Sequence, residues 1–406
     1  PLALAPTHPE WSAKEPVTRG QRITAILLMA LIVFGLIRAP LATARLLVLL
    51  CTVFYLVATI YKMWLVRSAT QPGAFFRFTP EMIAAEEPRE WPVYSIIVPM
   101  YKEPETIPQM IAGLKALDYP PERLDIQLLL EADDDATLNA ARAQVLPPQI
   151  RITEIPPSFP RTKPKACNIG LHLARGKYLV IYDAEDKPEP DQLKKAVMSF
   201  DRSPDNVVCI QSCLNYYNPR YNLLTRWFAA DYSAWFDLCL PGLAARRTVI
   251  PLGGTSNHFN TQVLRDLLGW DAYNVTEDCD LGVRLARAGY ETRMAETTTW
   301  EEACSNLRFW IRQRTRWQKG YIQTWLVHIR RPFRLLRELG LRNFLHFNLL
   351  IGGSVFATLI NPFFWIMALV WFIFRPVGVD ALFPGWVFAM SAFCLFVGNF
   401  IFVYIN

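Results

Sequence analysis

The chain has 406 residues, of which 52% are hydrophobic and 19% are charged. A soluble domain ordinarily carries about 25% charged residues, so this composition predicts a water-soluble domain joined to a few membrane helices. The 13% aromatic content and the lack of a heptad or Gly-X-Y repeat exclude disorder, coiled coil and collagen. Because the chain begins at Pro1 and ends at Asn406 inside an apolar run, we expect it to be part of a longer protein.

The net charge is mildly positive, at +6 from 42 Lys and Arg against 36 Asp and Glu. This excess fits a protein on an anionic membrane surface or one that handles phosphorylated substrates. It is too diffuse for a nucleic-acid binder, whose basic residues form a dense stripe. The 8 cysteines include no Cys-x-x-Cys motif, which favours a reducing compartment over a disulfide framework or a zinc site.

Four apolar runs without charge predict membrane-spanning helices: residues 23–37, 46–61, 347–374 and 381–406. The first two have 15 and 16 residues, slightly fewer than the lower limit of about 17 for a span. Flanking arginines and Lys62 can extend them, because long basic side chains reach the lipid interface. The alternative is a buried helical hairpin in a soluble protein.

Between the second and third runs lies a segment of 285 residues, 62–346, which is long enough to bury its own core. Basic residues flank it, and the positive-inside rule places it in the cytoplasm of a multi-pass protein of the inner (plasma) membrane. The expected organisation is a cytoplasmic segment, two membrane helices, a catalytic domain, amphipathic interface helices and two further membrane helices: 1–22, 23–66, 67–305, 306–345 and 346–406.

After a proline-rich linker, strand and helix patterns alternate along the chain. The apolar patterns predict strands at 93–99, 125–131, 150–155 and 178–182, with helices at 107–117, 138–145, 165–174 and 193–200. Alternation at this spacing is typical of an α/β fold with a mostly parallel sheet and helices on both faces.

Acidic residues follow three of these strands: Glu103 after the first, Asp133 among the acids after the second, and Asp183, Glu185 and Asp186 after the fourth. Ligands of parallel sheets bind outside the carboxyl ends of the strands, so these acids converge on one rim and need a cation there. Ordinary turn and capping acids are the alternative explanation. The sequence contains neither a dinucleotide fingerprint nor a P-loop, and closely spaced carboxylates suit Mg²⁺ or Mn²⁺.

Two later motifs have a structural and a functional interpretation. Glu277 and Asp278 open a predicted helix, where acids are also favoured by the helix dipole. The stretch 309–317 contains Gln-Arg-Thr-Arg-Trp, and an amphipathic helix on a membrane surface would have a similar pattern.

Taken together, the ordered motifs resemble the processive, membrane-embedded glycosyltransferases of family 2, the cellulose, hyaluronan, chitin and curdlan synthase type. The series is Asp133-Asp134, Asp183-Ala-Glu185, Thr276-Glu-Asp278 and Gln313-Arg-Thr-Arg316-Trp317, the last being the family's Gln-x-x-Arg-Trp signature. The resemblance covers residues 20–406. It implies a Rossmann-like GT-A domain inserted between transmembrane helices.

The resemblance also implies residue roles. The nucleotide of a UDP-sugar would contact Tyr101, Glu103, Asp133, Lys165, Asn168, Gln313 and Arg316. The metal, Mg²⁺ or Mn²⁺, would be held by Asp183 with Glu185 or Asp186, although the family has Asp-x-Asp where this chain has Asp-Ala-Glu-Asp. Asp278 would be the general base beside Glu277, and the acceptor sugar would meet Trp317 and the small-residue loop at Ser256.

By this resemblance the protein is expected to be an inverting hexosyltransferase that adds glucose from UDP-glucose to the non-reducing end of a growing β-glucan. Because lipid cannot satisfy the hydroxyls of the glucan, secretion needs a protein-lined channel beside the active site. Further partners would be the bilayer, periplasmic or outer-membrane export proteins, and cyclic di-GMP acting through a segment beyond Asn406. Three alternatives stay open: transfer to a lipid phosphate, an inactive receptor or export scaffold, and a transporter.

Overall fold

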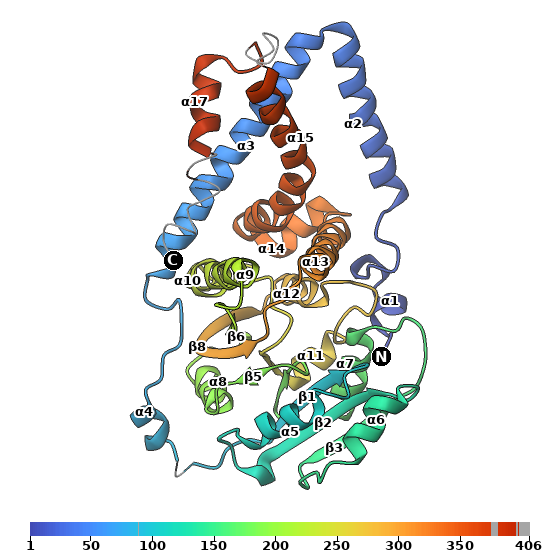
Figure 1. Cartoon of the computed structure of the whole chain (residues 1–406), viewed down its shortest axis with the longest axis vertical. Helices are drawn as coiled ribbons and strands as arrows, with labels where there is room; N and C mark the ends of the chain where they lie inside the picture. The colour runs from blue at the N-terminus through green and yellow to red at the C-terminus, as the bar shows by residue number, and fades with distance from the viewer. Residues whose placement is uncertain (88, 375–380, 395–396, 398–406) are drawn as a thin grey trace.

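A computed structural model describes residues 1–87, 89–374, 381–394 and 397. Figure 1 shows two parts, an α/β domain at one end and long helices that project from it at the other. The predicted fold class is confirmed, because the domain is built on one eight-stranded, mostly parallel sheet.

The sheet has the strand order β3-β2-β1-β4-β7-β6-β8-β5. Its strands are β1 (Tyr94–Met100), β2 (Leu124–Glu131), β3 (Ile150–Ile155), β4 (Tyr178–Ile181), β5 (Lys187–Pro188), β6 (Val207–Tyr216), β7 (Asn257–Asn260) and β8 (Glu291–Glu301). The first four strands pair in parallel, and β7 runs antiparallel to both β4 and β6. The carboxyl ends of β1, β2 and β4 therefore lie at one edge, as the sequence predicts.

Helices cover both faces of the sheet (Figure 1). Those of the domain are α4 (Pro80–Ala85), α5 (Ile107–Lys115), η2 (Pro121–Arg123), α6 (Asp135–Arg142), α7 (Lys163–Leu173), α8 (Gln192–Asp201), α9 (Leu223–Ser233), η3 (Ala234–Cys239), α10 (Leu240–Ala245), α11 (Thr261–Asp266) and α12 (Glu277–Arg287). Successive strand residues enter opposite cores. On β1, Ile96 and Val98 join one hydrophobic cluster, while Ile97 joins the other. Burial on both faces explains why the central strands are continuously apolar.

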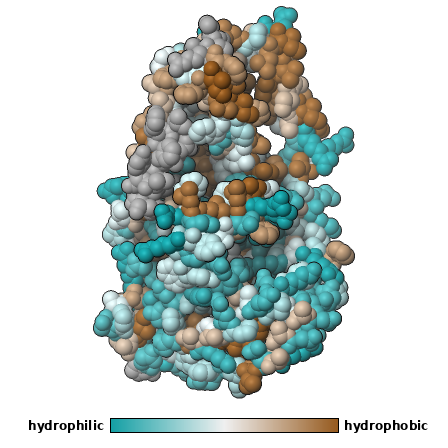
Figure 2. All heavy atoms as spheres, viewed as in Figure 1, coloured by the Kyte–Doolittle hydropathy of each residue, from teal (hydrophilic) through white to brown (hydrophobic). Residues whose placement is uncertain are grey.

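The projecting helices are α2 (Arg19–Arg38), α3 (Pro40–Ala69) and α15 (Gly353–Phe374), with α17 (Gly385–Phe393) beside them. Among the described residues, three helices are long and apolar enough to cross a membrane: Arg19–Arg38, Pro40–Ala69 and Pro332–Phe374. Figure 2 shows hydrophobic side chains gathered at this end, whereas hydrophilic residues predominate on the domain. The fourth predicted span, 381–406, contains α17, and its residues 395–396 and 398–406 are outside the described residues.

Two helices join the domain to α15. They are α13 (Leu307–His328) and α14 (Pro332–Phe347), and α14 continues through the short π-helical segment η4 (Asn348–Gly352). At the other end of the chain, α1 (Leu4–Thr7) and η1 (Pro9–Trp11) pack on the domain. There the backbone amide of Ala13 and the hydroxyl of Ser12 donate to the Asp271 carboxylate over 2.5 and 3.0 Å. The domain is thus held from both sides by segments that lead into apolar helices.

Candidate active site

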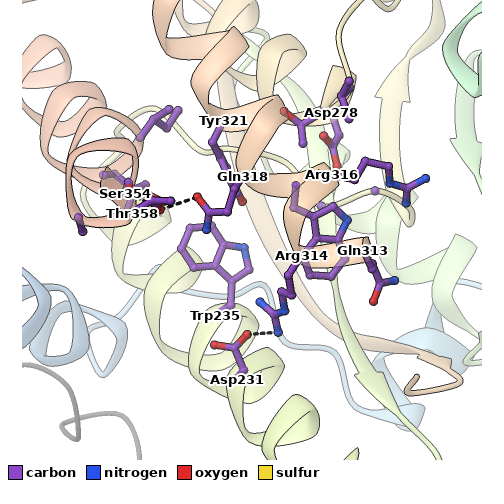
Figure 3. Close-up of a pocket in the computed structure, with 18 of the residues that line it drawn as sticks. Asp231, Trp235, Asp278, Gln313, Arg314, Arg316, Gln318, Tyr321, Ser354 and Thr358 are labelled. Atoms are coloured by element: carbon purple, nitrogen blue, oxygen red, sulfur yellow. Dashed lines mark hydrogen bonds and ion pairs between the residues drawn. The ribbon is translucent and has the colours of Figure 1, made fainter. Parts of the chain in front are cut away.

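One large cavity, of roughly 2150 Å³, opens at the carboxyl edge of the sheet. Its walls come from the ends of β1, β2 and β4, the loop before β7, the start of α12 and one side of α13. The cavity continues between α3 and α15, where Ser354, Thr358 and Asn361 line it. Figure 3 shows the middle of this cavity, with labelled residues from α9, η3, α12, α13 and α15.

Carboxylates converge where β1 and β4 end. Asp183, Glu185 and Glu103 all line the cavity, and Glu301 reaches it from the end of β8. Burial, with the charges of Glu185 and Asp183, raises the pKa of Glu103 to about 7. Burial and Asp183 also raise the pKa of Glu185. Charged carboxylates repel each other here, so the site favours a cation, as the sequence predicts for this rim.

Lys163 is the positive group inside this acidic cluster. It is the first residue of α7, and its ammonium group pairs with Asp183 and donates to the backbone carbonyl of Gly254 over 2.9 Å. Burial lowers the pKa of Lys163, but the nearby carboxylates of Asp183 and Glu277 raise it by more. The net pKa is above the ordinary value for lysine, so the ammonium group is charged. A fixed ammonium beside an acidic rim suits a phosphate ligand, whose charge it can neutralise.

Glu277 and Asp278 lie side by side in the first turn of α12, and both line the cavity. Burial and the neighbouring Asp278 raise the pKa of Glu277, and burial raises that of Asp278 to about 6. The amide of Cys279 donates to Asp278 over 2.7 Å and holds its carboxylate in place. A carboxylate with a pKa near neutrality, facing a cavity, is well suited to accept a proton.

The Gln-x-x-Arg-Trp residues lie in the first half of α13. Gln313, Arg316 and Trp317 all line the cavity, as does Arg314 between them. The Arg314 guanidinium lies 4.9 Å from the Trp317 ring centre and pairs with Asp231 of α9 over 2.5 Å, an interaction drawn in Figure 3. The stacked Arg314 guanidinium thus holds the Trp317 indole in place at the cavity wall. An indole has a large flat apolar face on which a sugar ring can pack.

Besides the acids Asp133 and Asp186, three predicted site residues lie outside the cavity lining. Lys165 is fully buried and pairs with Glu131 over 3.1 Å. Asn168 accepts from the amide of Trp270 and donates to its carbonyl, and Ser256 is buried with its hydroxyl on Thr299. Lys163 occupies the position expected of Lys165, because residues two apart on a helix point to nearly opposite sides.

Two further acids lie at the margin of the site. Asp133 pairs with Arg161 over 2.6 Å, and of these two only Arg161 lines the cavity. Asp186 turns inward, where one carboxylate oxygen accepts from the amide of Asp183 and the hydroxyl of Thr255. Its other oxygen is buried without a partner. Tyr101, by contrast, lines the cavity and is 45% exposed.

The donor set of the cavity fits a divalent cation. Among the described residues no three Asp, Glu, His or Cys side chains form a ready-made protein-ligated metal centre. Mg²⁺, however, usually takes one or two carboxylates and completes its shell with substrate phosphates and water. Asp183 and Glu185 both face the cavity and could supply those carboxylates, whereas Asp186 faces away from it.

Several cavity residues belong to no motif found in the sequence. Trp235 comes from η3, and Gln318 of α13 accepts from the hydroxyl of Thr358 on α15 over 2.9 Å (Figure 3). Tyr321 lines the cavity one turn beyond Gln318. The only signal for this set is the polar and aromatic content of α13 beyond its signature, since the contact with α15 depends on how the helices pack.

The chain is similar in sequence to known glycosyltransferases over the part that forms this site. Residues 91–320 match the family described as glycosyltransferase like family 2. Probable glycosyltransferase YdaM of Bacillus subtilis is 26% identical over 257 residues, which are 62% of this chain and 61% of that protein. Probable glucomannan 4-beta-mannosyltransferase 1 of Arabidopsis thaliana is 24% identical over 241 residues, 57% of this chain and 43% of that protein. The chain thus spans only part of the relatives it matches.

A solved structure shares the fold. It is mannosyltransferase PcManGT from Pyrobaculum calidifontis in complex with GDP-mannose and Mn²⁺, with a TM-score of 0.51 and 17% identity over 87% of this chain and 99% of that one. The family match covers more than half of the chain and contains the carboxylates, the α12 acids and the signature residues in the first half of α13. The chain therefore belongs to the glycosyltransferase-like family 2.

Proposed function

We propose that this chain is an inverting hexosyltransferase that extends a β-linked glycan and passes the product toward the membrane. The observation that carries the proposal is the continuous cavity, which runs from Asp278 and Trp317 to the polar residues of α15. A polymer covered with hydroxyls needs such a lined route, because lipid offers them no hydrogen bonds.

The donor we propose is a nucleoside diphosphate hexose. The motif resemblance favours UDP-glucose, whereas relatives such as the Arabidopsis thaliana protein are named as glucomannan mannosyltransferases. The solved structure of similar fold holds GDP-mannose. We therefore propose transfer of glucose or mannose into a glucan or glucomannan-type chain, with GDP-mannose and UDP-glucose as the two donors to compare.

In the proposed reaction, Asp278 takes the proton of the acceptor hydroxyl as that oxygen attacks the anomeric carbon. Attack from the face opposite the leaving group converts an α-linked donor into a β-linked product. Lys163 and Arg316 neutralise the charge on the departing diphosphate, a role in which one well-placed donor can contribute about 3 kcal/mol. A divalent cation held by Asp183 and Glu185 would add Lewis-acid stabilisation of the same charge.

We further propose that the α/β domain lies in the cytoplasm of a multi-pass membrane protein. The basic residues at its junctions support this orientation, since cytoplasmic loops carry an excess of Lys and Arg. Arg67 lies in the last turn of α3 on this side, and Arg331 and Arg342 lie where the domain leads into α15.

The test is to incubate purified membranes containing the full protein with radiolabelled UDP-glucose, GDP-mannose or both, in Mg²⁺ or Mn²⁺. A polymer that a linkage-specific β-glycanase degrades would support the proposal and identify the sugar. Nucleotide release with no high-molecular-weight product from any donor would overturn the polymerase role. Label that moves into organic solvent would indicate a lipid-phosphate acceptor instead.

A further inference from the structure

Behind the proposed base lies a buried polar network that the catalytic motifs do not include. Asp280 follows Asp278 by two residues on α12, so its side chain points away from the cavity toward the end of α13. There it accepts from Arg284 over 2.8 Å and contacts Nε2 of His328 over 3.0 Å. The side chains of all three residues are fully buried.

The contacts define the tautomer of His328. Arg287 lies 2.8 Å from Nδ1 of the ring, and a guanidinium can only donate, so Nδ1 accepts. Nε2 therefore carries the hydrogen and donates it to Asp280. Burial also lowers the pKa of His328, which agrees with a neutral ring. Nη1 and Nη2 of Arg284 also donate to the backbone carbonyls of Leu267 and Gly269, and Arg287 pairs with Glu338 of α14 over 2.7 Å.

A second set of contacts joins α13 to the loop that precedes the base. Gly320 packs so closely on Thr276 that a Cβ atom at Gly320 would lie 2.3 Å from its methyl group. One turn further along α13, the hydroxyl of Thr324 accepts from the side-chain amide of Asn274 over 3.0 Å. The side-chain carbonyl of Gln323 accepts from the backbone amide of Val275 over 3.3 Å. The second half of α13 therefore contacts the loop and helix from 274 to 280, while its first half carries Arg316 and Trp317.

We propose that His328 is a positioning residue that fixes the base, Asp278, relative to the acceptor and diphosphate residues Trp317 and Arg316. It lies twelve residues, or about 18 Å of helix, beyond Arg316. Its hydrogen bond to Asp280 fixes how α12 is rotated about its axis, and where it lies along that axis, relative to α13. The inference rests on the proposed function, because it assigns His328 a part in the same transfer reaction.

The experiment compares His328→Ala with His328→Gln in the full membrane protein. We expect His328→Ala to lower kcat about tenfold or more, since small misplacement of a catalytic group is costly, and to leave donor KM and nucleotide affinity unchanged. Glutamine has a carbonyl oxygen that can accept from Arg287 and an NH2 group that can donate to Asp280, so it should restore most of the rate. His258→Ala is the matched control, because it removes another buried imidazole with two partners, Tyr94 and Ser212, away from α12.

Hydrogen exchange of the same variants provides a readout that does not depend on turnover. His328→Ala should speed exchange of the amides at 276–281 more than tenfold, whereas His258→Ala should leave them unchanged. Normal kcat and unchanged exchange in His328→Ala, or equal loss of kcat in both variants, would overturn the positioning role. A wild-type protein inactive on every donor would count against the proposed function, but the exchange comparison would still decide whether His328 holds α12.

Discussion

At the residue scale, the site is defined by how carboxylates share a confined space. Glu103, Glu185 and Glu277 all have a pKa raised chiefly by burial, and Lys163 is the cation that pairs directly with Asp183 among them. Such crowding is unfavourable in an empty site and becomes favourable when a cation and a phosphate arrive. In the proposed function, a metal-bound nucleotide would relieve this repulsion at the rim.

The pH dependence of transfer should reflect Asp278. Because burial raises its pKa to about 6, the base is protonated below that pH and ionised above it. We expect kcat/KM to fall about tenfold for each unit below pH 6, because kcat/KM reports the pKa of the free enzyme. A pH profile of kcat/KM at subsaturating donor measures this limb, and an acid limb near pH 4, the ordinary value for aspartate, would contradict it.

Replacing the base should separate binding from chemistry. Asp278→Asn keeps the size of the side chain but removes its ability to take a proton, so transfer should fall by about 10²–10⁴-fold. Donor affinity, measured by isothermal titration with the nucleotide sugar, should stay within about twofold of wild type. Polymer elongation at a normal rate in this variant would show that another group is the base.

Arg314 should affect acceptor binding through its contact with Trp317. Arg314→Gln removes both the pair with Asp231 and the cation over the indole, so the acceptor surface should loosen. We expect acceptor KM to rise about five- to tenfold with little change in nucleotide affinity. Asp231→Asn is the informative partner variant, because it removes the ion pair and keeps the stacked cation. If acceptor KM is unchanged in Arg314→Gln, Trp317 does not depend on Arg314.

At the element scale, the position of α12 depends on α13, because Gly320 of α13 packs directly against Thr276 just before α12. Gly320→Val would force methyl groups into Thr276, and overpacking of this kind costs about 1–3 kcal/mol. We expect a lower unfolding temperature, measured by thermal denaturation in detergent, and reduced kcat. Gly20→Ala, where no atom lies within 4 Å of the added Cβ, should change neither quantity. Full activity of Gly320→Val would show that the helices tolerate separation.

The strands and helices of the first half of the domain follow their sequence patterns closely. The predicted strand at 125–131 is β2 (Leu124–Glu131), and the predicted helix at 165–174 begins two residues earlier, at Lys163. That small difference decides which lysine faces the cavity. Apolar periodicity indicates which side of a helix is buried, but it does not say which polar residue of the first turn points at a ligand.

At the scale of the whole molecule, the cavity joins the proposed sugar-transfer site to apolar helices. If product leaves between α3 and α15, narrowing that part should shorten the product without blocking the first transfer. Ser354→Trp places an indole where a small hydroxyl now lines the cavity. We expect shorter products by size-exclusion chromatography and a near-normal initial rate.

Leu359→Trp is the matched control for that variant. It lies on the same helix, but its side chain is 58% exposed and is not among the cavity-lining residues. Product length should therefore stay that of wild type. Equal product lengths in wild type, Ser354→Trp and Leu359→Trp would contradict a route between these helices.

The sequence by itself determined the α/β class, the apolar segments and the acidic strand ends, because these depend on local periodicity and on the rule that parallel strands end at one edge. It also identified Asp183, Asp278 and Trp317 as residues of one site. Only the tertiary structure decided that Lys163 and not Lys165 reaches the cavity, that Asn168 and Ser256 are buried outside it, and that His328 touches Asp280. Those outcomes depend on side-chain direction and helix packing between segments far apart in the chain, which no local pattern encodes.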